Sequence, residues 1–276
     1  MIDAHQHFWK FDPVRDSWID DSMQVLKRDF MPEDLHPLMV ENGVEGCVAV
    51  QADQSLTETK FLLDLAEKHA FVSGVVGWVD LMSRDLAGTL DIFTTSSYLK
   101  GFRHILQAEN EGFMLQPSFI QGLKTLSTSG YTYDLLIYEN QLDEALRLVR
   151  QLPDLPVVVD HLAKPAIAHH QGEDLHHWKA KMKAMATHEN VMVKLSGMVT
   201  EANWTNWTYE QLKPYMEVVL DCFSPERVMF GSDWPVCTLA ASYHQVVEHI
   251  KRFCQELSDT ESAQILGLNA KKFYNL

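Results

Sequence analysis

Two histidines lie two residues apart near the start of the chain, in the segment Asp3-Ala4-His5-Gln6-His7. In a β-strand the side chains alternate between two faces, so Asp3, His5 and His7 are expected to share one face. Two imidazoles that converge in this way can bind one metal ion or one substrate. The alternative is a pair of histidines packed in a core. The position of both at the end of a first strand favours the functional interpretation.

A second polar group follows a run of three valines at 157–159, where the sequence continues Asp160-His161-Leu-Ala-Lys164-Pro. Charged side chains are costly to bury without partners, so they are expected at the end of the strand or in ion pairs. If Val157 and Val159 face the interior, His161 has the same parity and faces the site. The alternative is the start of a helix with a surface lysine.

A third group is Gly-Ser-Asp233-Trp-Pro, which closes a short apolar strand. Asp233 is placed to act as a metal ligand or a general base, although a helix N-cap is the ordinary role of such an aspartate. A fourth is Gly-Phe-Arg103-His104, where the arginine can bind a carboxylate or carbonyl oxygen, the alternative being a structural salt bridge. Tyr138, at the end of a fifth strand, can donate a hydrogen bond to a substrate, and Lys164 can hold a substrate hydroxyl or carboxylate.

Eight short apolar runs alternate with amphipathic stretches, and these runs are the predicted strands. They cover residues 1–8, 46–51, 73–79, 100–106, 132–138, 156–161, 191–196 and 228–233. Eight such units in 276 residues predict an α/β fold, a single-domain (β/α)8 TIM barrel over residues 1–276. The longest loops, at 9–30, 107–116, 163–174 and 197–207, then lie at the carboxyl ends of strands, where such barrels carry their active sites.

Composition excludes several classes of protein. Thirty-eight acidic and 23 basic residues give a formal charge of −15, which disfavours a nucleic-acid partner. No apolar stretch is long enough to span a membrane, and no secretory leader is recognisable. The four cysteines form no C-x-x-C pair and are expected to be reduced thiols, so the expected location is the cytoplasm. No phosphate-binding glycine loop follows the first strand, which argues against a doubly wound sheet.

The His-x-His, Asp-His-Leu-Ala-Lys-Pro and Gly-Ser-Asp-Trp-Pro motifs, in this order between His5 and Pro235, resemble the amidohydrolase superfamily. With Gly-Phe-Arg-His they are most similar to its amidohydrolase-related (type 2) branch and, within it, to the hydrolases of L-fuconolactone and L-rhamnonolactone. The resemblance implies a (β/α)8 barrel that hydrolyses a bond at a carbonyl carbon, with Asp233 as general base. It also implies metal or substrate ligands at His5, His7 and His161.

The binuclear members of that superfamily carry a histidine on strand five, and the segment 132–138 has none. The resemblance therefore implies either one divalent ion such as Zn²⁺, held by His5, His7, His161 and Asp233, or metal-independent catalysis.

The resemblance implies a hydrolase for a small cyclic ester, specifically a sugar (aldono) lactone. Asp233 would deprotonate the attacking water, and Zn²⁺, or Arg103 with His161, would stabilise the oxyanion. Arg103, His104, Lys164 and Tyr138 are the predicted substrate-binding side chains. The alternatives are a metal-dependent decarboxylase of the same branch and a barrel that binds a small sugar acid without turnover.

Overall fold

The computed structural model describes residues 1–276 and has one parallel sheet of eight strands in the order β1 to β8. The strands are β1 (Ile2–Gln6), β2 (Gly46–Val50), β3 (Val72–Gly77), β4 (Leu99–His104), β5 (Thr132–Leu135), β6 (Val157–Val159), β7 (Val191–Leu195) and β8 (Val228–Phe230). A parallel bridge between Gln6 and Trp234 joins the first strand to the segment after the last. The predicted (β/α)8 barrel is therefore confirmed.

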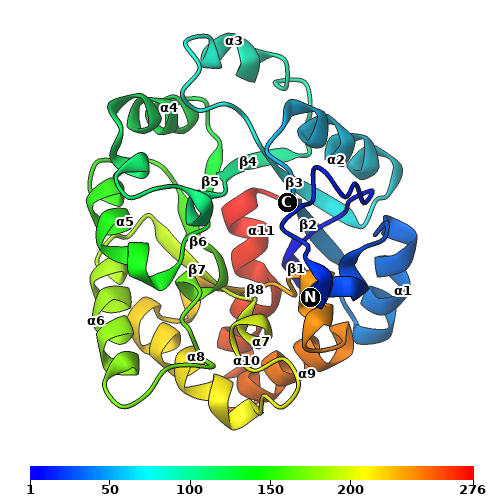
Figure 1. Cartoon of the computed structure of the whole chain (residues 1–276), viewed down its shortest axis with the longest axis vertical. Coiled ribbons are helices and arrows are strands. Elements are labelled where there is room, and N and C mark those ends of the chain that lie inside the picture. Colours follow the sequence, from blue (N-terminus) through cyan, green and yellow to red (C-terminus); the bar gives the residue numbers. More distant parts are fainter.

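The helices form a layer around this barrel, as Figure 1 shows in the view along its axis. They are α1 (Pro32–Asn42), α2 (Leu56–Lys68), α3 (Leu86–Asp91), α4 (Pro117–Thr128), α5 (Leu142–Val149), α6 (Asp174–Ala186), α7 (Met198–Glu201), α8 (Tyr209–Phe223), α9 (Tyr243–Cys254), α10 (Asp259–Ala263) and α11 (Asn269–Tyr274). Side-chain caps fix the start of several; for example, the Ser55 hydroxyl accepts a hydrogen bond from the Glu58 amide at 3.1 Å.

Two apolar layers hold the barrel together. The larger lies between strands and helices and includes Val157 and Val159 of β6. The smaller fills the inside of the barrel, where Ala4, Val48 and Val158 pack together with side chains of α11. Successive strand residues therefore alternate between the helix layer and the barrel interior, as the pleat of a strand requires.

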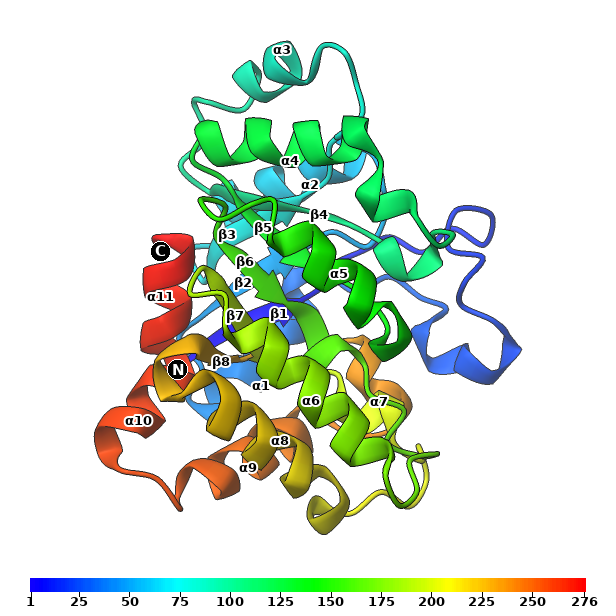
Figure 2. The ribbon, with the colours of Figure 1, turned by 90° about the vertical axis from the view of Figure 1, so that its left-hand side faces the viewer.

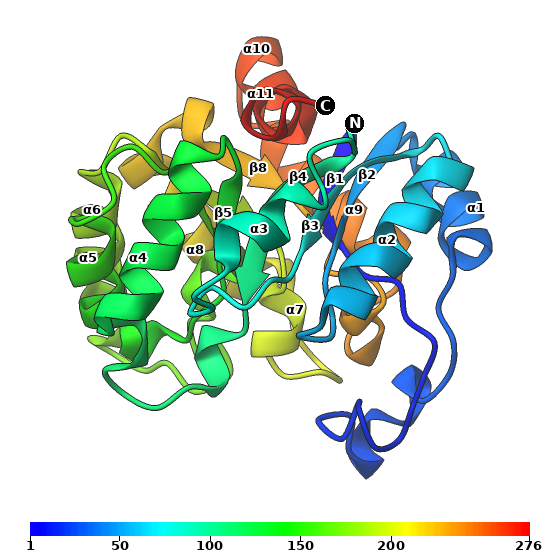
Figure 3. The same cartoon turned by 90° about the horizontal axis from the view of Figure 1, so that it is seen from above.

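The two ends of the barrel differ in what covers them. In Figures 2 and 3, α10 and α11 lie at one end, while the long β1–α1 connection and α7 lie at the other. This second end is where the strands terminate at their carboxyl ends, the face that carries the active site in barrels of this type. None of the helices combines the length and apolar character that crossing a bilayer requires.

Candidate active site

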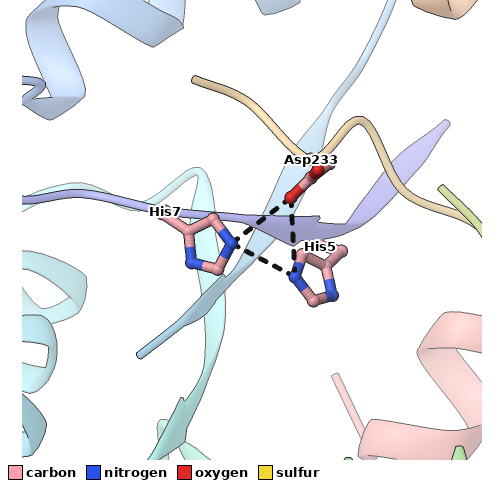
Figure 4. A group of neighbouring side chains, drawn as sticks. All are labelled: His5, His7 and Asp233. Atoms are coloured by element: carbon pink, nitrogen blue, oxygen red, sulfur yellow. Dashed lines mark hydrogen bonds and ion pairs between the residues drawn. The ribbon is translucent and has the colours of Figure 1, made fainter. Parts of the chain in front are cut away.

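His5, His7 and Asp233 meet at the carboxyl end of the barrel, as Figure 4 shows. The two histidines come from β1 and its end, and the aspartate follows β8. The His5 and His7 Nε2 atoms are 3.2 Å apart, and the nearer oxygen of Asp233 lies 3.4 Å from His7 Nε2 and 3.9 Å from His5 Nε2. All three side chains are at least nine-tenths buried. The barrel thus brings together residues that are more than 220 positions apart in sequence.

The tautomer of His7 is set by the neighbouring strand. Its Nδ1 lies 2.7 Å from the carbonyl oxygen of Val50, and because a carbonyl only accepts, Nδ1 carries the proton. The lone pair of Nε2 therefore faces the Asp233 carboxylate. The His7 Nε2 lone pair and the Asp233 carboxylate oxygen are both acceptors, and at 3.4 Å they repel each other unless a proton or a cation lies between them. This point of the site is therefore suited to a water molecule that donates a proton or to a positive ion.

His5 is held from below by a buried ionic network. Its Nδ1 lies 3.2 Å from Asp160 and 3.1 Å from the Lys194 ammonium. Lys194 also pairs with Asp160 at 3.0 Å and with Asp134, which accepts hydrogen bonds from the Tyr274 hydroxyl of α11. The three charged groups are fully buried, and one ammonium between two carboxylates partly offsets the cost of burying them.

Arg103 supports the same network from β4. Its guanidinium donates to Asp160 at 3.2 Å, lies 3.3 Å from His5 Nε2 and donates to the carbonyl oxygen of Gln51. Most of its donor groups therefore point at the protein itself. Arg103 is thus a partner in a structural salt bridge, and it also lines the cavity described below, so its role in substrate binding stays a prediction.

His161 reaches the site from an unusual turn after β6. Its Nε2 lies 3.7 Å from Asp233, and its Nδ1 lies 2.8 Å from the Ser196 hydroxyl. A Cβ on Gly197 would lie 2.7 Å from His161 Nδ1, closer than any real Cβ contact, and Gly197 has a φ of +64°. Glycine at position 197 is thus required both by the backbone conformation and by the space that the imidazole occupies.

Left-handed backbone gathers at this end of the barrel. The residues from His161 to Lys164 have φ of 52°, 55°, 59° and 47°, and Asp233 has φ of 59°. A left-handed conformation costs an ordinary residue about 1–2 kcal/mol, so a run of four persists only where the surroundings hold it. One such contact is the Trp178 indole, which donates to the carbonyl oxygen of Leu162 at 3.1 Å. Strain of this kind concentrates at functional sites.

Two parity arguments made from the sequence are wrong. The pairing of β1 with β2 shifts register between Asp3 and Gln6, so Asp3 does not share a face with the two histidines. Its carboxylate instead accepts from the Tyr243 hydroxyl of α9 and the Ser232 amide. On β6, Val157 and Val159 face the helices, and His161 reaches the site because the strand has already ended at Val159.

Two predicted substrate-binding residues, His104 and Tyr138, are not among the residues that line the cavity described below. His104 points away from the barrel interior, pairs with Glu109 at 2.8 Å and stacks on the ring of Phe113. The reason is strand alternation, because the preceding Arg103 faces inward. Tyr138 lies in the turn beyond β5, 42% exposed, with its ring centroid 5.5 Å from the Lys164 ammonium. His104 is therefore a packing residue, whereas Tyr138 lies beside Lys164.

Burial shapes the protonation of the site. It lowers the pKa of His161 to about 4 and that of His5 well below its usual value, although nearby carboxylates act in the opposite direction. For Asp233, burial alone would raise the pKa, but the charges of His161 and the other two histidines hold it below its usual value. At neutral pH the Asp233 carboxylate therefore lies beside neutral imidazoles at His5 and His161.

A cavity of about 340 Å³ opens above these residues. Its polar and apolar walls are formed by His7, Trp9, Trp18, Ala52, Gln54, Arg103, Ile105, Gln107, Ala108, Leu136, His161, Lys164, Asp233 and Val236. The volume is in the range of small-molecule sites. Asp233 faces it with an imidazole on either side, so the arrangement can hold a small molecule and take a proton from a bound water.

The donor atoms of His5, His7 and Asp233 also fit a metal ion. Ligands of one tetrahedral zinc ion lie about 3.3–3.4 Å apart for bonds of about 2.0–2.1 Å. The three separations here, 3.2, 3.4 and 3.9 Å, are close to that value. The hydrogen on His7 Nδ1 leaves Nε2 free to coordinate, and Asp160 can orient His5 in the same way.

Comparison with known proteins gives consistent results over the whole chain. The amidohydrolase family model matches residues 2–276. An L-fucono-1,5-lactonase of Burkholderia multivorans is 38% identical over 284 residues, which cover 100% of this chain and 96% of the relative. A crystal structure of an amidohydrolase from the same species, with bound zinc, superposes with a TM-score of 0.97 at 38% identity and covers 100% and 99% of the two chains.

An L-rhamnono-gamma-lactonase of Scheffersomyces stipitis is 28% identical over 200 residues, which cover 64% of this chain and 59% of that protein.

Proposed function

The chain belongs to the amidohydrolase family, and from that premise we propose that it hydrolyses the cyclic ester of a small lactone, specifically a sugar (aldono) lactone. One observation carries the proposal: the Asp233 carboxylate, among three imidazoles, faces a cavity of about 340 Å³. Support for the substrate class comes from the relatives, since the chain is 38% identical to an L-fucono-1,5-lactonase.

In the proposed reaction Asp233 takes a proton from a water molecule held beside it, and the water oxygen attacks the lactone carbonyl carbon. The imidazole of His161 supplies a donor for the oxyanion. When the Ser196 hydroxyl donates to His161 Nδ1, the neutral ring carries its proton on Nε2, on the side of Asp233. A neutral imidazole that donates from Nε2 can stabilise the negative charge that develops on the carbonyl oxygen.

His5, His7 and Asp233 are the residues that would hold a divalent ion such as Zn²⁺, with His161 beside them. A bound divalent ion would polarise the carbonyl and lower the pKa of a water molecule. The Arg103 guanidinium, 3.3 Å from His5 Nε2, opposes a second positive charge at this point. The affinity for the ion is therefore expected to be modest. Comparing the rate of hydrolysis before and after treatment with a chelator tests whether hydrolysis depends on the ion.

The test is a pH-stat screen of aldonolactones with the purified protein, before and after chelation. The wild type is expected to release one equivalent of acid per lactone, and Asp233→Asn to lower kcat by about 10²–10⁴-fold, as loss of a general base does. Near-normal hydrolysis by a folded Asp233→Asn variant contradicts the assignment of the base. Release of CO₂ from a carboxylated substrate would instead support the decarboxylase alternative, and saturable binding without turnover the non-enzymatic one.

A further inference from the structure

Lys164 differs from the other cation of the cavity in having free donors. Arg103 is engaged by Asp160, His5 and Gln51, so much of its hydrogen-bonding capacity is used within the protein. The Lys164 ammonium has one charged neighbour, the Glu201 carboxylate at 3.7 Å, which is too long for a strong hydrogen bond. Apart from this ion pair, its N–H groups have no acceptor within hydrogen-bond distance and are available to a ligand, although only 19% of the side chain is exposed.

The structure fixes the lysine at this point from two sides. Its left-handed backbone ends the turn that begins at His161, and the Lys164 amide donates to the His161 carbonyl oxygen at 2.7 Å. A bond from residue i+3 to residue i places these two side chains on the same side of the turn. His161 and Lys164 therefore both face the cavity, where both are among the lining residues.

Glu201 supplies the second side. It ends α7, and its carbonyl oxygen accepts from the Ala168 amide at 2.9 Å, which joins the β7–α8 connection to the segment after Lys164. Its carboxyl is four-fifths buried. Burial raises its pKa, Lys164 opposes that effect, and the charge of Asp233 adds to it. Glu201 thus lies within electrostatic reach of both the proposed base and the lysine.

We propose that Lys164, held in place by Glu201, binds the ring oxygen of the lactone and stabilises the alkoxide that forms when the ring opens. This inference rests on the proposed lactonase function. Water attack forms a bond between the water oxygen and the carbonyl carbon, and Asp233 takes the proton. Ring opening then breaks the bond between that carbon and the ring oxygen, the electron pair goes to the ring oxygen, and the proton returns to it from Asp233. Lys164 is the catalytic residue here, and Glu201 is a positioning residue.

The chemistry of an aldonolactone makes this role necessary. Its leaving group is an ordinary alkoxide, which is far more basic than an aryloxide, so expulsion of the ring oxygen needs a donor. Arg103 is committed below the cavity and His161 lies on the side of Asp233, whereas Lys164 offers an ammonium among largely apolar walls. Charge stabilisation is stronger there than in bulk water.

The test measures how the tetrahedral intermediate divides between ring opening and return to the lactone. Hydrolysis in ¹⁸O-labelled water is stopped part-way, and ¹⁸O in the carbonyl group of the unreacted lactone is compared with product formed. Wild type is expected to show little exchange. In Lys164→Met the ratio of exchange to hydrolysis should rise at least about tenfold, the result of raising the second barrier by about 1.4 kcal/mol. Lys164→Arg, which keeps a charged donor, should restore most of the wild-type ratio.

Glu201→Gln should raise the same ratio by a smaller factor, and Glu256→Gln, which removes the partner of the surface Lys213, is the matched control and should leave it unchanged. A Lys164→Met variant that loses kcat at an unchanged ratio, or that changes only KM, overturns the inference while leaving the lactonase function in place. A wild-type protein that hydrolyses no lactone overturns the proposed function itself.

Discussion

Replacing Gly197 with alanine tests whether the position of His161 controls the reaction. The added Cβ would lie 2.7 Å from His161 Nδ1 and 2.8 Å from its Cγ, whereas ordinary contacts begin at 3.4 Å. The ring must therefore move by about 0.7 Å, the difference between these values. Such a shift breaks the 2.8 Å bond to the Ser196 hydroxyl and moves Nε2 relative to Asp233. A misplacement near 1 Å can cost about 10²-fold, so we expect kcat/KM to fall about 10- to 100-fold.

Gly43→Ala is the matched control for this substitution. Gly43 has a φ of +69°, close to the +64° of Gly197, but a Cβ there would meet no atom within 4 Å. Both variants should lose about 1–2 kcal/mol of unfolding free energy for the left-handed backbone, measured by urea denaturation. Only Gly197→Ala should also lose activity on a lactone. If its kcat/KM stays within about twofold of wild type, the imidazole is not the group on which the oxyanion depends.

Two further predictions concern buried charge. Burial raises the pKa of Glu58 from 4.5 to about 7, so the folded protein binds this proton more tightly than the unfolded chain does. The free energy of unfolding is therefore expected to fall as the pH rises from 4.5 to about 7. Glu58→Gln should remove this pH-dependent loss. At about 1.36 kcal/mol per pKa unit, the variant should be up to about 3 kcal/mol more stable than wild type at pH 8 but not at pH 4.5. An equal difference in unfolding free energy at both pH values would contradict this. Lys194→Met should lower the free energy of unfolding by about 3–5 kcal/mol, because it leaves Asp134 and Asp160 buried without their ammonium partner. Lys213→Met, which removes a surface ion pair, should lower it by at most about 1 kcal/mol. Similar losses for the two variants in urea denaturation would show that the buried network adds little stability.

The sequence was sufficient to predict the barrel because the barrel follows from local patterns, the apolar runs that form strands and the amphipathic stretches that form helices. Each of the eight strands falls within or near an apolar run, and a run of that kind between amphipathic stretches has few other solutions. The ends of strands were less accurate. The sequence placed His161 and Asp233 inside strands, but β6 ends at Val159 and β8 at Phe230. Both residues lie in left-handed turns, and the turn at His161 continues through Leu162, Ala163 and Lys164, residue types that rarely adopt this conformation.

The residues that are hardest to place from the sequence are those whose roles depend on other strands. Lys194 stands out as a lone polar residue in its strand and is expected to pair with an acid of the barrel, but only the closure of the barrel identifies Asp134 and Asp160 as its partners. Glu201 has no sequence signal, since it is one of many acidic residues on the helices and loops. A polar residue at an inward position of an otherwise apolar strand was the available clue for Asp134 and Lys194, because a barrel interior does not retain an unpaired charge.

The site therefore rests on two different kinds of support. Below, the ion pairs of Lys194 with Asp134 and Asp160 orient His5 through contacts that are buried on all sides. Above, His161 and Asp233 stand on strained turns whose conformation is set by neighbouring loops. The lower group stiffens one wall of the cavity, while the upper group responds to changes in those loops. Substitutions around Lys194 should accordingly cost more unfolding free energy than substitutions near α7, whose larger effect should be on turnover.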